Sequence, residues 1–185
     1  MAAFTLVGMG GGGWLLIARV QGRDAFAILL GPWQWGVQAV VGIGAGLIIA
    51  WIGWWIIARP DMIEVRIRYA GLVRELMPDR SLQLAVSLCA GIGEELLFRG
   101  AVQYWLGIPL TAVLFVALHG YLPLRNSPLF RYGLFLTIAM LGIGWAADHC
   151  GLLLAMTAHA VIDAVLIRRL VAESVDFKNG APRNP

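Results

Sequence analysis

The stretch GIGEELLFRGAVQ, residues 91–103, places three charged side chains inside an apolar run. Glu94 and Glu95 are adjacent, and Arg99 follows four positions after Glu95. A charge that is removed from water is costly unless it is paired or serves a function. What these three charges can do therefore depends on the solvent that surrounds the rest of the chain.

The composition of the chain is that of a membrane protein. Of its 185 residues, 59% are apolar and 14% are charged, and the mean hydropathy is +0.77. Soluble domains carry about 25% charged residues, and a soluble fold of this size could not bury so much apolar surface. We therefore expect an all-α, polytopic membrane bundle. In such a protein the basic pI of about 9.2 reports topology and does not indicate a nucleic-acid partner.

Six segments are long and apolar enough to approach the roughly 20 residues that a bilayer-spanning helix needs. They are residues 1–18, 33–58, 82–101, 104–122, 129–147 and 151–170. The first contains GMGGGG, which weakens its helix propensity. No basic residue precedes it and no cleavage pattern follows it, so we expect it to be a retained span and not a signal peptide. In the second segment, Gly42 and Gly46 allow another helix to approach closely.

The chain divides into four parts by composition. Residues 1–58 hold two N-terminal membrane helices, and residues 59–81 form an amphipathic helix at the membrane interface or a structured loop. Residues 82–170 hold the four remaining helices, and residues 171–185 are expected to be a disordered tail. Within residues 59–81 the apolar side chains recur at helical spacing; they are Ile63, Ile67, Ala70, Val73 and Met77, with Arg66 elsewhere on the helical wheel.

Basic residues indicate the orientation of the chain. With six helices and a cytoplasmic N-terminus, eleven of the fourteen Lys and Arg residues lie in cytoplasmic segments. The exceptions are Arg19, Arg23 and Arg99, of which Arg99 belongs to a span. This asymmetry predicts that both termini are cytoplasmic, in the plasma membrane of a prokaryote.

Ionisable groups inside the spans are few, and all lie in the second half of the chain. Each costs about 2.5–3.5 kcal/mol to insert into a bilayer, so each is a candidate functional group. They are Glu94, Glu95, Arg99, His119, His159 and Asp163. Residues four apart share a helix face, so Arg99 is expected to pair with Glu95 and to leave Glu94 available as a general base.

The two histidines have neighbours at the same spacing. Phe115 is expected to pack against His119, and Asp163 is expected to accept a hydrogen bond from Nδ1 of His159. Either feature alone can be structural, and the carboxylates with Arg99 can be a buried ion cluster that fixes helix register. Together they suit the activation of a water molecule and the stabilisation of an oxyanion. The same groups can also ligate zinc, although the chain has no HExxH motif.

The three motifs together resemble those of a known family. They are Glu94-Glu95-x-x-x-Arg99, Phe115-x-x-x-His119 and His159-x-x-x-Asp163. Their order and spacing resemble the CAAX-protease and bacteriocin-processing (CPBP, or Abi) intramembrane endopeptidases, glutamate-type enzymes long labelled metalloproteases. The resemblance covers residues 82–170.

The resemblance implies a role for each residue. Glu94 would be the base with His119 beside it, His159 and Asp163 would form the oxyanion site, and Glu95 with Arg99 would support them. Asp163 stands where many relatives carry asparagine, and an ionised carboxylate cannot donate a hydrogen bond to an oxyanion. Asp163 is therefore either protonated or an orienting group for His159.

Several functions follow from these observations. The first is an intramembrane endopeptidase that cuts a membrane-associated protein or peptide, with CAAX proteins, leader peptides and sorting signals all open as substrates. A zinc-dependent version would hold the metal with Glu94, His119 and His159. The alternative is a catalytically inactive membrane protein that acts in immunity or partner binding. Helix depth is a difficulty, because Glu94 lies about 18 Å along its span, whereas a helix over 104–122 places His119 nearer the surface.

Overall fold

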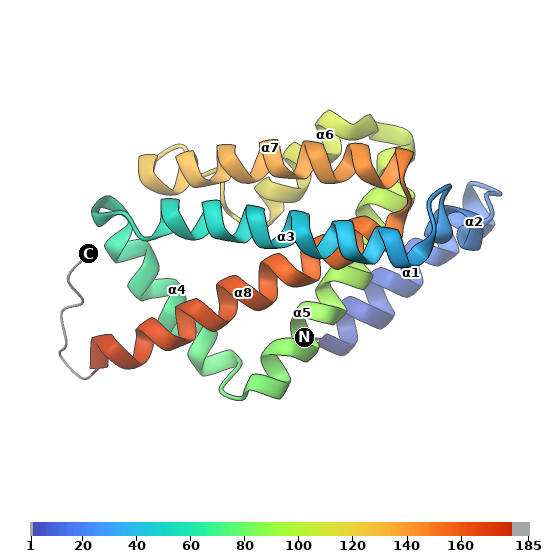
Figure 1. Cartoon of the computed structure of the whole chain (residues 1–185). Coiled ribbons are helices and arrows are strands. Elements are labelled where there is room, and N and C mark those ends of the chain that lie inside the picture. Colours follow the sequence, from blue (N-terminus) through green and yellow to red (C-terminus); the bar gives the residue numbers. More distant parts are fainter. Residues whose placement is uncertain (1, 179–185) are drawn as a thin grey trace.

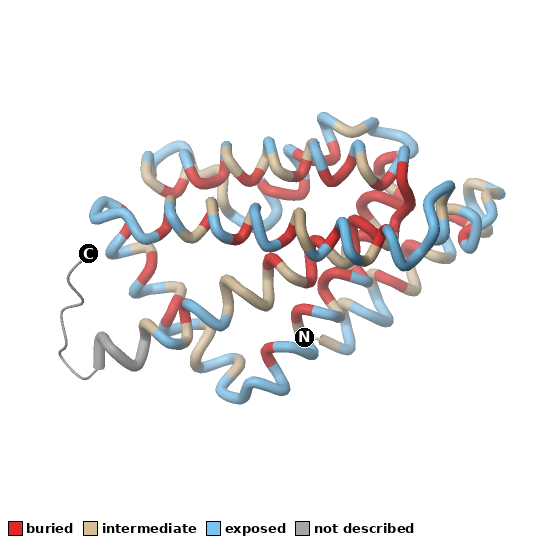
Figure 2. Tube along the Cα trace, in the orientation of Figure 1, coloured by how far each residue is buried: buried red, intermediate tan, exposed pale blue. Residues whose placement is uncertain are grey.

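The computed structural model describes residues 2–178, and the side chains of residues 2–173. Within that part of the chain every regular element is a helix (Figure 1). Three long helices, α3 (Trp35–Ile57), α7 (Ser127–His149) and α8 (Leu152–Lys178), run beside one another. Buried positions line their inner faces, and the outer faces carry exposed apolar side chains (Figure 2). These observations confirm an all-α membrane bundle.

The N-terminal helix is continuous despite its glycines. It consists of η1 (Phe4–Gly10), α1 (Gly11–Leu15) and η2 (Leu16–Val20), and α2 (Ala25–Leu30) follows it. The glycines permit contact between backbones: a methyl group at Gly13 would lie 2.7 Å from Leu97 N. The glycines of the GMGGGG segment lower its helix propensity, but they allow it to pack closely against the segment that carries Arg99.

Helix α8 is held closely by two neighbours. On α3, a methyl group at Gly42 would lie 2.6 Å from Leu154 O, and one at Gly46 would lie 2.6 Å from Ala158 O. On α5, Gly91 makes the equivalent approach to Met156 O at 2.6 Å. The expected close approach at Gly42 and Gly46 is thus present, with α8 as the partner.

The interfacial segment forms a helix, and one of its arginines points into the protein. It consists of η3 (Pro60–Met62) and α4 (Ile63–Leu76). Ile63 and Ile67 are exposed, whereas Arg66 is buried and its Nε lies 2.7 Å from a Glu173 carboxylate oxygen of α8. Exposed isoleucines are compatible with the expected contact of this helix with the membrane interface, and the buried arginine is stabilised by a counter-charge on a distant helix.

The helix that carries both glutamates continues past them. It runs through α5 (Arg80–Glu95) and then widens to i→i+5 hydrogen bonding over η4 (Leu96–Val102). Helix α6 (Gln103–Leu118) is interrupted at Gly107, whose φ of 69° and ψ of 172° favour glycine. The expected helix over 104–122 therefore starts within one residue of the predicted position, but it is broken at Gly107 and ends early, at Leu118.

Residues 119–126 connect α6 to α7 without helical structure. A side chain at Gly133 would collide with the backbone of Tyr121, so this connection lies beside the second turn of α7. The start of α7 contacts η3, because Arg131 donates a hydrogen bond to Asp61. The same hydrogen bond holds the pKa of the Asp61 carboxyl below its usual range.

Membrane-spanning length is met by fewer helices than expected. In the described part of the chain, Trp35–Ile57, Arg80–Leu118 and Ser127–His149 are long and apolar enough to cross a bilayer, and Phe4–Val20 is shorter. Helix α8 extends to Lys178, so the expected disorder from residue 171 is wrong as far as residue 178, because the helix continues beyond its apolar part. Residues 179–185 of the expected tail lie outside the described residues.

Candidate active site

The close packing of α8 against α5 brings two of the candidate residues together. Gly91 of α5 contacts the backbone around Ala160, and Glu95 lies one helical turn further along the same face of α5. His159 precedes Ala160 and therefore faces Glu95. The glycine determines how closely the carboxylate and the imidazole can approach.

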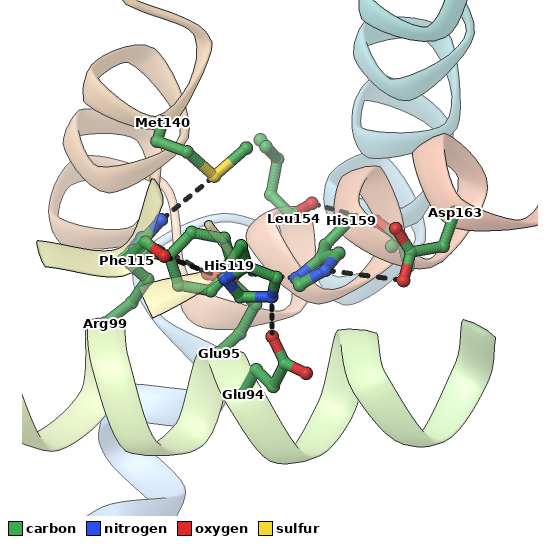
Figure 3. A network of polar contacts seen from close by, with 10 residues as sticks. Glu94, Glu95, Arg99, Phe115, His119, Met140, Leu154, His159 and Asp163 are labelled. Carbon is green, nitrogen blue, oxygen red and sulfur yellow. Dashed lines mark hydrogen bonds and ion pairs between the residues drawn. The ribbon is translucent and has the colours of Figure 1, made fainter. Parts of the chain in front are cut away.

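Glu95 is a buried carboxylate with two basic neighbours (Figure 3). One of its oxygens accepts a hydrogen bond from His159 Nδ1 at 2.9 Å, and the other lies 3.4 Å from Arg99 Nε. All three residues are buried, with exposed fractions of 0%, 5% and 4% for Glu95, His159 and Arg99. The expected pairing of Arg99 with Glu95 is present.

The surroundings of Arg99 fix its guanidinium within the bundle. Nη2 lies 3.1 Å from the Met140 sulfur, and the guanidinium carbon lies 4.8 Å from the centre of the Phe115 ring. Phe115 also packs on His119, with ring centres 4.3 Å apart, as the sequence predicts. The aromatic ring therefore links the arginine to the histidine of the next motif.

The hydrogen bond expected between His159 Nδ1 and Asp163 is absent. Nδ1 donates to Glu95 instead, and Asp163 lies 3.6 Å from Nε2 on the other side of the ring. That expectation was wrong because it considered a single helix, whereas the stronger acceptor comes from α5. With a carboxylate facing each nitrogen, the arrangement favours an imidazolium that can donate from both nitrogens.

Glu94 lies beside the second histidine (Figure 3). Its Oε2 is 3.2 Å from His119 Nε2, and His119 Nδ1 lies 2.7 Å from the Phe115 carbonyl oxygen, to which it donates. Glu94 Oε2 has no aligned hydrogen-bond partner among the described residues, although it is buried. A buried acceptor without a partner is a place where a water molecule can bind.

The break at Gly107 resolves the difference in depth between Glu94 and His119. Glu94 lies 14 residues after Arg80, the start of α5, or about 21 Å along the helix. The regular part of α6 is short and ends at Leu118, and residues 119–126 follow it as an irregular connection that begins with His119. The two side chains can therefore meet.

A cavity of about 530 Å³ adjoins the cluster, and Glu94, His119, His159 and Asp163 all line it. Its other walls are mainly apolar side chains from the N-terminal helix, α4, α7 and α8. Cavities of about 300–1,000 Å³ commonly hold ligands. This one therefore offers an apolar surface directly beside groups that can activate water.

The zinc set Glu94, His119 and His159 does not fit this arrangement. Across residues 2–178 no group of three or more His, Cys, Asp or Glu side chains is placed to hold a metal ion. A metal would need Nε2 of both histidines, because Nδ1 of each is already hydrogen-bonded. These Nε2 atoms face different carboxylates, Glu94 for His119 and Asp163 for His159. The chemistry below therefore uses only the side chains of the protein.

The sequence-based search missed the tyrosines of the cavity. Tyr69 of α4, Tyr121 of the connection and Tyr132 of α7 all line it. The ring centres of Tyr69 and Tyr132 lie 6.1 Å and 5.5 Å from that of Tyr121. Only the proximity of Tyr121 to His119 in the sequence could have drawn attention to it.

Comparison with known proteins identifies a related family. A family model described as type II CAAX prenyl endopeptidase Rce1-like matches residues 79–165. All six candidate residues fall within this range. No curated protein and no solved structure matches the chain. The match confirms the resemblance that the three motifs predict.

Proposed function

We propose that this integral membrane protein is an intramembrane endopeptidase of the CAAX type, on the premise that residues 79–165 match the Rce1-like family of type II CAAX prenyl endopeptidases. Its substrate is a membrane-associated protein or peptide with an apolar part that enters the cavity. The contact between Glu94 and His119 at the cavity wall carries this proposal. A carboxylate and an imidazole in contact can both hydrogen-bond one water molecule that lies beside them in the cavity.

In the proposed reaction Glu94 is the general base. It takes a proton from water while the water oxygen adds to the carbonyl carbon of the scissile bond. His119 orients the water, since its Nδ1 is held by the Phe115 carbonyl and its Nε2 faces Glu94. The carbon–nitrogen bond then breaks, and the proton held by Glu94 passes to the leaving amine.

His159 stabilises the oxygen that becomes negative when water adds. Glu95 accepts a hydrogen bond from Nδ1 of His159 and so fixes the orientation of the ring. The other nitrogen, Nε2, then faces Asp163 at the cavity. An imidazolium in this place donates a hydrogen bond to the oxyanion. Glu95 and Arg99 act through His159 and are positioning residues.

The proposed orientation places both termini and the α4 end of the bundle in the cytoplasm. That end carries Arg59, Arg66 and Arg131, and α4 lines the cavity there. Basic residues concentrate on the cytoplasmic side of membrane proteins. A substrate would therefore enter from the cytoplasmic side, in the plasma membrane of a prokaryote.

The test is cleavage by the purified full chain of a prenylated peptide that ends in a CAAX sequence. We expect Glu94→Gln to reduce the cleavage rate by at least about 10²-fold, since general-base catalysis contributes about 10²–10⁴. Glu75→Gln, at an exposed position of α4, is the matched control and should keep the rate. Full activity in Glu94→Gln would move the base elsewhere, and an inactive unaltered protein would favour a partner-binding role.

A further inference from the structure

The proposed site has a shortage of hydrogen-bond donors. Water addition creates a negative oxygen, which enzymes usually stabilise with two or more donors. His159 can supply one, and Asp163, which lies 3.6 Å from His159 Nε2, only accepts whenever it is ionised. The candidates for a second donor are therefore the other residues of the cavity wall.

Tyr121 has the properties of such a donor. Its ring lies parallel to that of His119, with an interplanar angle of 11° and centres 6.2 Å apart. It lines the cavity, and among the described residues no side chain or backbone group is hydrogen-bonded to its hydroxyl. A phenol keeps its proton near neutral pH because its ordinary pKa is about 10. The hydroxyl is therefore a donor without a partner, next to the histidine of the site.

Ring contacts separate Tyr121 from the other phenols of the cavity. The Tyr121 ring lies against that of His119. The rings of Tyr69 and Tyr132 lie against that of Tyr121 and, within the described part of the chain, make no ring contact with either histidine of the cluster. Tyr121 is thus the phenol beside the histidine of the site.

We infer that Tyr121 is a further catalytic residue, whose hydroxyl donates a hydrogen bond to the oxyanion of the tetrahedral intermediate. This inference rests on the proposed function. As the water oxygen adds to the carbonyl carbon, the electrons of the C=O double bond move onto oxygen, and Glu94 holds the proton of the water. Tyr121 keeps its own proton throughout. When the C–N bond breaks, the carbonyl re-forms and the hydrogen bond from Tyr121 weakens.

The first experiment removes the hydroxyl and keeps the ring. With the prenylated CAAX peptide and the full chain in detergent, we expect Tyr121→Phe to lower kcat by about 10²-fold, the usual cost of losing one oxyanion donor. KM should change by less than about threefold, because the donor acts mainly in the transition state. Tyr104→Phe, which removes an exposed phenol that does not line the cavity, should keep both constants.

The second experiment supplies a replacement donor. Asparagine at position 163 offers an amide N–H where the present carboxylate offers none. We therefore expect the double variant Tyr121→Phe/Asp163→Asn to regain at least about tenfold in kcat over Tyr121→Phe alone. A hydroxyl with a merely structural role gives no such rescue, because the amide does not repair packing. All rates are expressed per folded molecule, measured as the monodisperse fraction in gel filtration.

The possible outcomes separate this inference from the proposed function. Unchanged kcat in Tyr121→Phe, with activity still lost in Glu94→Gln, contradicts the role of Tyr121 alone. A large loss in Tyr132→Phe with none in Tyr121→Phe assigns the donor to Tyr132 and also overturns the inference. If the double variant Tyr121→Phe/Asp163→Asn shows no rescue of kcat, the inference about Tyr121 is also contradicted. Absence of cleavage by the unaltered protein contradicts the proposed function itself.

Discussion

At the scale of single residues, one carboxylate organises the buried cluster. Glu95 contacts Arg99 on its own helix and His159 on α8, and it has no exposure to solvent. A buried charge with two opposite partners is tolerated in an apolar interior, whereas a buried charge left alone is strongly destabilising. The same contact turns His159 so that Nε2, and not Nδ1, faces Asp163.

Removal of the arginine should therefore destabilise the fold. We expect Arg99→Met to lower the free energy of unfolding by about 3–5 kcal/mol, because Glu95 loses its cation in a buried place. Arg80→Met, at the exposed start of the same helix, should change it by less than about 0.5 kcal/mol. Thermal unfolding in detergent measures both. Equal melting temperatures for the two variants would show that the pair contributes little.

At the scale of helices, one broken element determines where the third motif lies. A continuous helix over 104–122 would carry His119 away from Glu94. Gly107 adopts a conformation that is nearly restricted to glycine, and the helix that follows it is short. The irregular connection after Leu118 then covers the remaining distance, with Tyr121 and Leu122 half-buried and Leu124 exposed.

A side chain at the break should disturb both stability and activity. We expect Gly107→Ala to cost about 1–3 kcal/mol, since alanine is strained at this backbone conformation, and to reduce cleavage by displacing His119. Gly142→Ala in α7 is the control, because a methyl group there meets nothing within 4 Å and alanine favours a helix. Comparable stability and activity in the two variants would mean that α6 does not need its break.

At the scale of the whole molecule, two ion pairs that join different helices lie at one end of the bundle. Arg131 pairs with Asp61, and Arg66 pairs with Glu173, so α4, α7 and α8 are joined where the cavity wall consists partly of α4. Such an end belongs at an aqueous surface.

Cysteine labelling in intact cells tests this orientation. In a variant whose Cys89 and Cys150 are alanine, a membrane-impermeant maleimide should label His149→Cys directly, because that residue lies at the opposite, external end. Leu124→Cys, which is 90% exposed at the α4 end, should react only after the cells are permeabilised. The reverse pattern would invert the proposed topology and the side from which substrate enters.

Much of this site could be predicted from local spacing. The i, i+4 rule gave the contacts of Glu95 with Arg99 and of Phe115 with His119, because residues at that spacing share a helix face whatever surrounds the helix. The rule failed for His159 and Asp163, although the spacing is the same. A hydrogen bond across two helices depends on how closely they pack, which for α5 and α8 is decided at Gly91.

The sequence by itself determined that the chain is an all-helical membrane protein, that the few ionisable groups inside its predicted spans lie within residues 94–163, and that their spacing is that of a hydrolytic family. Composition and helix periodicity are local properties, so they can be obtained without knowing the fold. Only the tertiary structure decided which carboxylate holds His159, how deep His119 lies, and that Tyr121 borders the same cavity. These depend on distances between segments far apart in the chain, which are set by glycine contacts and by one break in a helix.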